Sequence, residues 1–324
     1  MLKRFVIALL LVMSFALSAQ AAELKMDCNA IYGATNFHSQ GAQLFADKVA
    51  EYTSGSVQIT VHPGGSLGFK GPELLKTVKD GTLPMSDILM SGVAGSDEVF
   101  GVSSMPLIAN NYAEAKKLYD VAKPEYEKAC RRWNQKLLYA APWPPSGLFT
   151  QKPINTAADL EGLKTRTYDK NGAELLRAVG ASPMSLPWGE LYSALQTGLA
   201  DSVLTSAVSG KDGKFWETLK YFTKINYAFP LNMMVINQDY WDAMNPEQQK
   251  AVLKAAAEIE VYQWKQSSKS NDESLKALAD NGIIISEPTK EVADMLSSDA
   301  KLMLENTMKN AKKGFKAAIN AYKK

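Results

Sequence analysis

The chain has 324 residues, of which 46% are hydrophobic and 22% are charged, and its formal net charge at pH 7 is +2. This length can bury a large core and predicts one to three domains. The near balance of 36 basic and 34 acidic residues argues against a nucleic-acid partner or a strongly charged membrane surface.

The first 21 residues have the pattern of a cleaved signal peptide. Lys3 and Arg4 precede an apolar stretch at 5–17, which is shorter than the ~20 residues that span a membrane. Ala19-Gln20-Ala21 then places small residues at the positions that determine cleavage. We expect residues 1–21 to be removed and the mature chain to be periplasmic; an uncleaved anchor is the alternative.

Strands and helices alternate along the next part of the chain. Periodicity and turn residues predict strands at 24–32, 56–61 and 86–90, and helices at 36–52 and 72–79. Because alternating strands and helices form right-handed crossovers, we expect an α/β fold with a largely parallel sheet.

A group of prolines follows a long helical pattern and a strand. The pattern at 113–136 predicts a helix in two pieces, broken at Pro124, and a strand follows at 137–141. Pro142, Pro144 and Pro145 cannot donate to a sheet, so the strand has to end there. We predict that 142–147 is the first crossing between two lobes.

In the second half of the chain, predicted strands and helices alternate again, and the last part is mainly helical. Strands are predicted at 163–167, 202–206, 233–237 and 283–286, and helices at 172–179, 188–196, 247–280 and 290–322. The helix at 247–280 is more than twice the usual length, so we expect it to lie across both lobes.

Two α/β lobes joined by more than one segment predict a hinged cleft, with the ligand beyond the carboxyl ends of the strands. We assign residues 22–144 and about 233–270 to the first lobe. The second lobe is assigned residues 145–232 and about 271–324.

One enzyme motif occurs and is rejected. Gly64–Gly68 fits G-x-S-x-G between a strand and a helix, but both histidines, His38 and His62, precede Ser66. A nucleophile of this type needs a later histidine as its base, so we expect a glycine-rich turn and no catalytic residue.

The chain offers few ligands for metals and two cysteines for a disulfide. Two histidines and two cysteines at wide spacing make no metal site, and no cofactor is expected. Cys28 and Cys130 could pair in an oxidising compartment, but the sequence does not say whether they approach each other.

A long ordered match covers Leu160–Ser202. The strand Leu163-Lys164-Thr165-Arg166 leads to a helix, then to Gly180-Ala181-Ser182-Pro183 and an aromatic residue, and finally to E-x-Y-x-A-L-Q-x-G-x-x-D at 190–201. This order resembles the substrate-binding subunits of tripartite ATP-independent periplasmic (TRAP) transporters, the DctP family. The segments 52–68, 79–83 and 150–154 and the long helix agree, so the resemblance covers essentially the whole mature chain.

The resemblance implies a two-lobe periplasmic-binding-protein fold of type II-like architecture, and it places the ligand site. Arg166 matches the arginine that pairs with the ligand carboxylate, for which its guanidinium offers two parallel donors; a structural ion pair is the alternative. Trp188 matches an aromatic that borders the ligand, or else it packs in the core. The other expected ligand-binding residues are Asn36, Phe37, Ser91, Ser146, Thr205 and Asn232.

Two departures from the family pattern shape the expected ligand. Thr205 stands where some members carry an asparagine, and Ser146 stands near a second arginine of some members. A single cationic clamp favours a monocarboxylate. Nearby aromatic residues and methionines favour an apolar or aromatic tail, against the alternative that they are core residues. A 2-oxo or 2-hydroxy acid, a C4-dicarboxylate and a small sulfonate such as isethionate stay open.

The expected function is transport. A monomeric solute-binding protein would capture a small organic anion and deliver it to the membrane permease subunits of a TRAP transporter. The alternatives from other classes are a periplasmic hydrolase that uses Ser66 and a ligand sensor that docks on a receptor.

Overall fold

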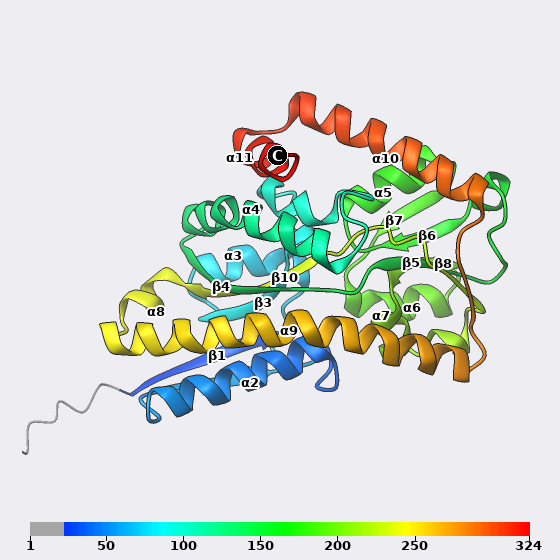
Figure 1. Ribbon diagram of the computed structural model, residues 1–324. Coiled ribbons are helices and arrows are strands. Elements are labelled where there is room, and N and C mark those ends of the chain that lie inside the picture. Colours follow the sequence, from blue (N-terminus) through cyan, green and yellow to red (C-terminus); the bar gives the residue numbers. More distant parts are fainter. Residues whose placement is uncertain (1–22) are drawn as a thin grey trace, which may run out of the picture.

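Two β-sheets, one in each of two lobes, organise the residues that the computed structural model describes, 23–324 (Figure 1). The predicted signal peptide lies outside the described residues. Within 23–324, no helix combines the length and the apolar character needed to cross a membrane. The two-lobe α/β fold that we predicted is confirmed.

The first lobe contains a five-stranded sheet in the order β2-β1-β3-β10-β4. β1 pairs in parallel with β2 and β3, whereas β10 runs antiparallel to both β3 and β4. The prediction of a largely parallel sheet therefore holds for four of the five strands, and the exception is β10, which returns from the other lobe and inserts antiparallel between β3 and β4. The strands are β1 (Leu24–Ala30), β2 (Val57–His62), β3 (Met85–Leu89), β4 (Gln135–Pro142) and β10 (Leu231–Asn237).

Helices pack on both faces of this sheet. One face buries α2 (Phe37–Tyr52) and the first half of α9 (Pro246–Asp280), and the other buries α4 (Tyr112–Arg132) and α11 (Lys313–Tyr322). The helix predicted at 72–79 consists of a 3-10 turn and α3 (Leu74–Lys79).

The second lobe contains a six-stranded sheet in the order β11-β9-β5-β8-β6-β7. It is also mixed, since β5 runs antiparallel to β8 and β9. Three of its strands, β5, β7 and β9, were not predicted. The strands are β5 (Ser146–Thr150), β6 (Lys164–Thr167), β7 (Ser182–Ser185), β8 (Ser202–Ser206), β9 (Tyr221–Thr223) and β11 (Ile284–Ser286), and the helices packed with them include α5 (Lys170–Ala178), α6 (Leu191–Gln196) and α7 (Ala207–Asp212).

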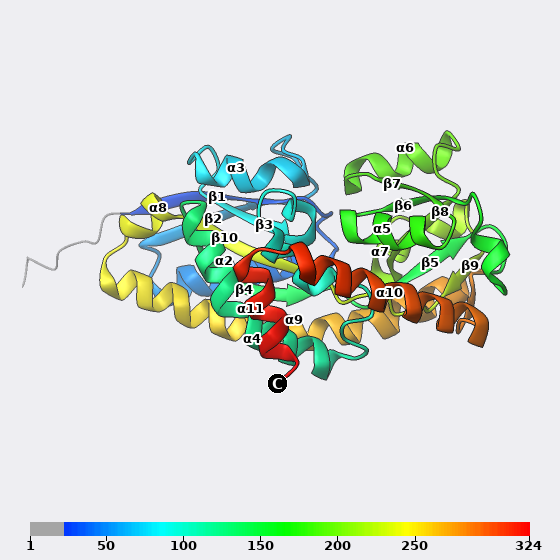
Figure 2. The same ribbon diagram turned by 90° about the horizontal axis from the view of Figure 1, so that it is seen from above.

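Several segments connect the lobes (Figure 2). The chain leaves the first sheet at Pro142 and enters the second at Ser146, where the prolines predicted a crossing. Helix α9 runs along both lobes, since it places Ile259 in the core of the first and Leu278 in the core of the second. Asn245 starts this helix with a capping box.

The last helices differ from the prediction. The chain is extended at Ala311 and Lys312, so the predicted helix 290–322 is divided into α10 (Lys290–Asn310) and α11. Helix α10 leads from the second lobe back to the first, and α11 packs on α4 through Phe315 and Ile319. Our assignment of all of 271–324 to the second lobe was therefore wrong for α11.

Helix α4 continues through Pro124, where we predicted a break. Ala122 and Tyr126, on either side of the proline, are fully buried in the core of the first lobe. We attribute the continuity to this packing, which outweighs the hydrogen bond that proline cannot make.

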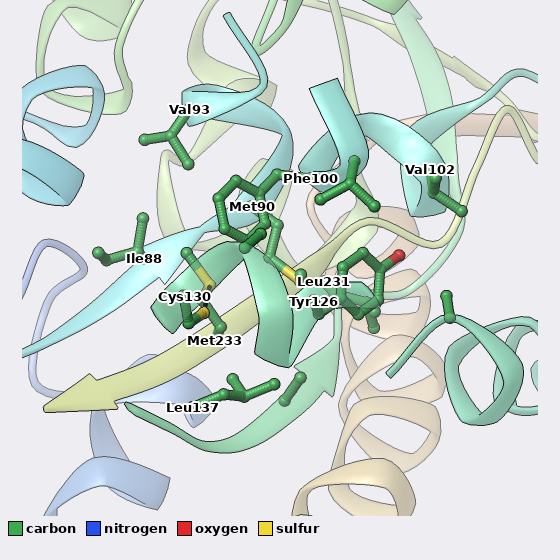
Figure 3. Close-up of a cluster of buried hydrophobic side chains, with 14 of the residues drawn as sticks. Ile88, Met90, Val93, Phe100, Val102, Tyr126, Cys130, Leu137, Leu231 and Met233 are labelled. Carbon is green, nitrogen blue, oxygen red and sulfur yellow. Dashed lines mark hydrogen bonds between the residues drawn. The ribbon is translucent and has the colours of Figure 1, made fainter. Parts of the chain in front are cut away.

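The two cysteines lie on opposite faces of the first sheet and are not bonded to each other. Cys28 lies against Met234, with 3.7 Å between the sulfur atoms, and Cys130 lies against Met233 at 3.9 Å (Figure 3). Successive residues of a strand point to opposite faces, so β10 separates the two thiols. A Cys28–Cys130 disulfide is excluded in this fold.

Candidate ligand-binding site

A cavity of about 290 Å³ lies between the two lobes. Its walls come largely from residues at or just beyond the carboxyl ends of β1, β3, β6 and β8 and from both crossings between the lobes, as expected for ligands of α/β sheets. The lining residues used below are Tyr32, Ser91, Trp143, Ser146, Arg166, Tyr168, Asp169, Lys170, Leu186, Trp188, Thr205 and Pro230.

Arg166 supplies a buried positive charge to this cavity. Strand β6 carries it between β8 and β7, and its Nε and Nη2 atoms donate to the carbonyl oxygen of Leu186 at 3.0 and 2.8 Å. These two bonds fix the plane of the guanidinium and use two of its five N–H groups. Among residues 23–324, no carboxylate lies within 4.0 Å of the guanidinium to form an ion pair.

The electrostatic state of Arg166 follows from its burial. Burial lowers the pKa of Arg166 to about 10, opposed by the neighbouring Tyr32, Tyr168 and Asp169. The guanidinium therefore stays protonated at neutral pH. A buried charge is stable only when it is paired, so the cavity is suited to an anion.

Asp169 lies three residues after Arg166 and lines the same cavity. It is the N-cap of α5, where its Oδ1 accepts a hydrogen bond from the amide of Gly172 at 2.8 Å. Burial raises the pKa of Asp169. The hydrogen bond from that amide, the nearby hydroxyls and the charge of Arg166 lower this pKa and so offset part of the effect of burial.

A hydrogen-bonded network lies behind the aromatic wall. Trp143 donates from Nε1 to Oδ1 of Asn232 at 2.8 Å, and Asn232 donates from Nδ2 to Oδ2 of Asp87 at 2.9 Å. The Trp143 amide also donates to the carbonyl of Pro230 at 2.7 Å. The two crossings are thereby joined to each other and to β3, which holds the Trp143 ring at the cavity and in contact with Tyr32.

Polar contacts join the lobes outside the cavity. Lys70 of the first lobe is 2.6 Å from a carboxylate oxygen of Glu190 of the second. Asn36 donates from Nδ2 to Oδ2 of Asp212 in α7 at 2.7 Å. The two lobes therefore contact each other across the cleft through these side chains.

The structure brings five of the eight predicted residues to the cavity wall: Ser91, Ser146, Arg166, Trp188 and Thr205. It does not bring Asn36, Phe37 or Asn232 there. Asn36 caps α2 and contacts the second lobe, Phe37 packs behind Trp143, and Asn232 belongs to the buried network. All three lie just behind the wall, so their sequence positions indicated the region but not their contacts.

Several cavity residues were missed. Tyr32 follows β1, Tyr168 and Asp169 follow β6, and Leu186 follows β7. Their positions after strands were the available signal, because ligands of α/β sheets bind at that edge. We also expected a single cation; Lys170 lines the cavity too, but its side chain is mostly exposed and pairs with Glu174.

Ser66 lies in an exposed turn away from these residues. Gly64, Gly65 and Gly68 adopt positive φ angles there, which glycine accepts at no steric cost. His62 pairs instead with Asp27, with 2.7 Å between Nε2 and Oδ1. The motif therefore has the geometry of the predicted turn.

We predict that His38 makes the stability of the protein depend on pH. Its ring is buried between Phe37 and Trp143, and burial lowers the pKa of His38 to about 3. The unfolded chain, with a histidine pKa near ~6.5, binds the additional proton between these values. The free energy of unfolding should therefore fall as the pH is lowered from about 6.5 towards 3.

The test compares the wild type with His38→Gln by urea denaturation at pH 7.5 and pH 5, without ligand. Between these pH values the wild type should lose about 2 kcal/mol more than the variant. Burial raises the pKa of Asp87 to about 7, which has the opposite effect on stability, but this contribution is common to both proteins. Parallel losses in the two proteins would contradict the prediction.

The sequence comparisons identify similar proteins over most of the chain. The model of a family described as bacterial extracellular solute-binding protein, family 7, matches residues 29–310. The 2,3-diketo-L-gulonate-binding periplasmic protein YiaO of Escherichia coli K12 is 26% identical over 246 residues, which cover 75% of this chain and 74% of that protein.

Solved structures match the fold closely. DctP7 of Bordetella pertussis, an extracytoplasmic solute receptor binding pyroglutamic acid, has a TM-score of 0.90 at 28% identity and covers 93% of this chain and 99% of its own. DctP6 of the same organism, also a receptor binding pyroglutamic acid, has a TM-score of 0.89 at 34% identity, with coverage of 92% and 99%.

Proposed function

Because the chain belongs to the DctP family of TRAP-transporter solute-binding proteins, we propose that it captures a small monocarboxylate, pyroglutamate, in the cavity between its lobes. In this proposal the protein works in the periplasm and delivers the ligand to the membrane permease subunits of a TRAP transporter. The expected signal peptide and the periplasmic relatives support the location.

The observation that carries the proposal is the buried guanidinium of Arg166, which has no carboxylate within 4.0 Å among residues 23–324. The carbonyl of Leu186 orients it, and the N–H groups that remain can bind a carboxylate in a bidentate manner. A ligand carboxylate would thus supply the pairing that a buried charge needs.

The remaining walls support a small, partly apolar ligand. Tyr32, Trp143 and Trp188 provide aromatic surface, and the cavity volume of about 290 Å³ limits the size of the ligand. A lactam ring with one carboxylate suits such walls, because its carbon atoms can pack on rings while its polar atoms find partners. The similar receptors from Bordetella pertussis bind pyroglutamic acid, which supports the same ligand for this chain.

A dicarboxylate is less well supported. Its second carboxylate would need another buried cation, whereas Lys170 is mostly exposed and is paired with Glu174. The carboxylate of Asp169 also lines the cavity and would repel a second negative charge. For a sulfonate, Arg166 could still serve as the anchor, so sulfonates belong in the ligand screen.

The proposal is tested by a thermal-shift screen of the mature protein. The panel contains pyroglutamate, other monocarboxylates, oxo- and hydroxy-acids, C4-dicarboxylates and small sulfonates. A ligand at about 100 times its Kd adds ~2.7 kcal/mol to the free energy of unfolding, so pyroglutamate should raise the midpoint clearly. The protein is unfolded and refolded before the screen, and mass spectrometry identifies any acid that it releases.

The outcomes separate the class of function from the ligand. A shift with pyroglutamate, or its release from the purified protein, supports the proposal in full. A shift with another acid retains the solute-binding function and replaces the ligand. No shift and no released acid would contradict binding of the classes in the panel.

A further inference from the structure

Asp169 does more than cap a helix. Its Oδ1 accepts the hydrogen bond from the amide of Gly172, but its Oδ2 is buried and accepts no hydrogen bond within 3.5 Å among residues 23–324, although the hydroxyls of Ser91 and Ser104 lie near this carboxylate. Asparagine and serine cap helices about as well as aspartate does. Capping α5 therefore does not explain why a second carboxylate oxygen is buried at the cavity.

The chemistry of this oxygen defines what could satisfy it. An ionised carboxylate only accepts hydrogen bonds, and an acceptor buried without a donor is unfavourable. Arg166, on the preceding strand, only donates, so the two side chains offer opposite functions to one cavity. A matching ligand carries a carboxylate for Arg166 and an N–H or O–H group for Asp169.

We propose that Asp169 is a specificity-determining residue, which accepts a hydrogen bond from an N–H or O–H group close to the carboxylate of the ligand and excludes acids that lack such a donor. This inference rests on the proposed function, because it concerns the same cavity. For pyroglutamate the donor is the lactam N–H, which is bonded to the carbon that carries the carboxylate. The ligand class is thus a monocarboxylate with an adjacent donor.

The test replaces one atom of the ligand. In the lactone analogue of pyroglutamate, a ring oxygen takes the place of the lactam N–H, so the donor becomes an acceptor while size and carboxylate are kept. Isothermal titration calorimetry should show that the wild type prefers the lactam by on the order of ten- to a hundredfold in Kd. Equal affinity for lactam and lactone would overturn the proposal.

Asp169→Asn gives the complementary test. The Gly172 amide should hold the side-chain oxygen of the variant, so its NH₂ group faces the cavity as a donor. The preference for the lactam should then disappear or reverse in favour of the lactone. Asp201→Asn, in the same lobe but outside the cavity, is the matched control and should keep the wild-type preference. An Asp169→Asn protein that keeps the wild-type preference would overturn the proposal.

Two controls keep the result interpretable. Because asparagine also caps helices, the unliganded Asp169→Asn protein should retain its circular dichroism spectrum and its unfolding midpoint. Should the variant not fold, Asp169→Ser, which also caps and leaves no acceptor of that reach, replaces it. In that variant the lactam preference should likewise be lost, and its persistence would overturn the proposal.

Failure of the ligand assignment can be recognised separately. If the wild type binds neither lactam nor lactone but binds another acid of the panel, pyroglutamate is wrong as the ligand. The structure of that acid then decides the role of Asp169. An N–H or O–H group beside its carboxylate supports the inference, and the absence of one overturns it.

Discussion

Replacing Arg166 by alanine should weaken binding of the anionic ligand by on the order of 10²–10³-fold or more, because removing one partner of a buried charge pair costs ~3–5 kcal/mol. Leu186 holds the guanidinium at the cavity, so the positive charge is oriented before the ligand arrives. Arg166→Lys should recover only part of this loss, since an ammonium group cannot reproduce the planar pair of donors. Calorimetric titration measures both effects.

Replacing Arg166 by methionine gives a second prediction, in which stability without ligand is kept or gained although ligand binding is lost. Without ligand, Arg166 is a buried charge that makes no ion pair within residues 23–324, so Arg166→Met should leave the free energy of unfolding unchanged or raise it. Arg177→Ala, an exposed arginine in the same lobe, is the control for both measurements. Wild-type affinity in Arg166→Ala would refute the site, and marked destabilisation by Arg166→Met would indicate a structural role.

Gly147→Ala should lower the free energy of unfolding by about 3 kcal/mol, at the upper end of the cost of overpacking a core. A Cβ atom there would lie 2.5 Å from the ring of Phe222 and 2.6 Å from the carbonyl oxygen of Thr223. Neither neighbour can move easily, because β5 pairs with β9 at this point and Phe222 packs on Phe149. Gly147 therefore allows the chain to enter the second sheet directly after the first crossing.

Gly189→Ala is the matched control in the same lobe. A Cβ atom at Gly189 would meet no atom within 4 Å, so its effect should stay within about 0.5 kcal/mol. Urea denaturation measures the free energy of unfolding of both variants. The slope m should be the same as in the wild type, so that a change in the midpoint reports a change in stability. A Gly147→Ala protein as stable as Gly189→Ala would show that the β5–β9 region can relax.

The sequence predicted those parts of the fold that have strong local signals. Asn245 and Pro246 start the long helix and Gly282 follows its end, so its extent could be predicted from capping residues and composition. The prolines after 141 predicted the first crossing. The L-K-T-R motif placed Arg166 on a strand, and the structure brings that strand to the cavity.

Elements that depend on tertiary contacts were not predicted. The break between α10 and α11 falls at Ala311 and Lys312, neither of which is glycine or proline. We attribute it to the packing of Phe315 and Ile319 in the core of the first lobe. β7 and β9 are too short to show a periodic pattern. Helix α4 passes through Pro124 because of its buried neighbours, which no local rule contains.

The contacts of individual side chains in the candidate site could not be predicted from the sequence either. The position of Asp169 before a helix indicates an N-cap, and the structure has this cap. The order of the residues does not indicate that Asp169 also lines a cavity. Asn232 was placed near the second crossing, but its two hydrogen bonds join it to the first crossing and to β3, which are far apart from it in the chain. Such roles arise from three-dimensional neighbours and not from spacing.

The burial of both cysteines makes the protein convenient to label. Both thiols are buried and unreactive at neutral pH, since burial raises the pKa of Cys130 to about 12 and that of Cys28 further still. A new cysteine introduced at the rim of the cleft, for example at Lys70, would therefore be the one that a maleimide dye modifies. The native thiols can stay in place, and the dye would convert this chain into a fluorescent sensor for its own ligand.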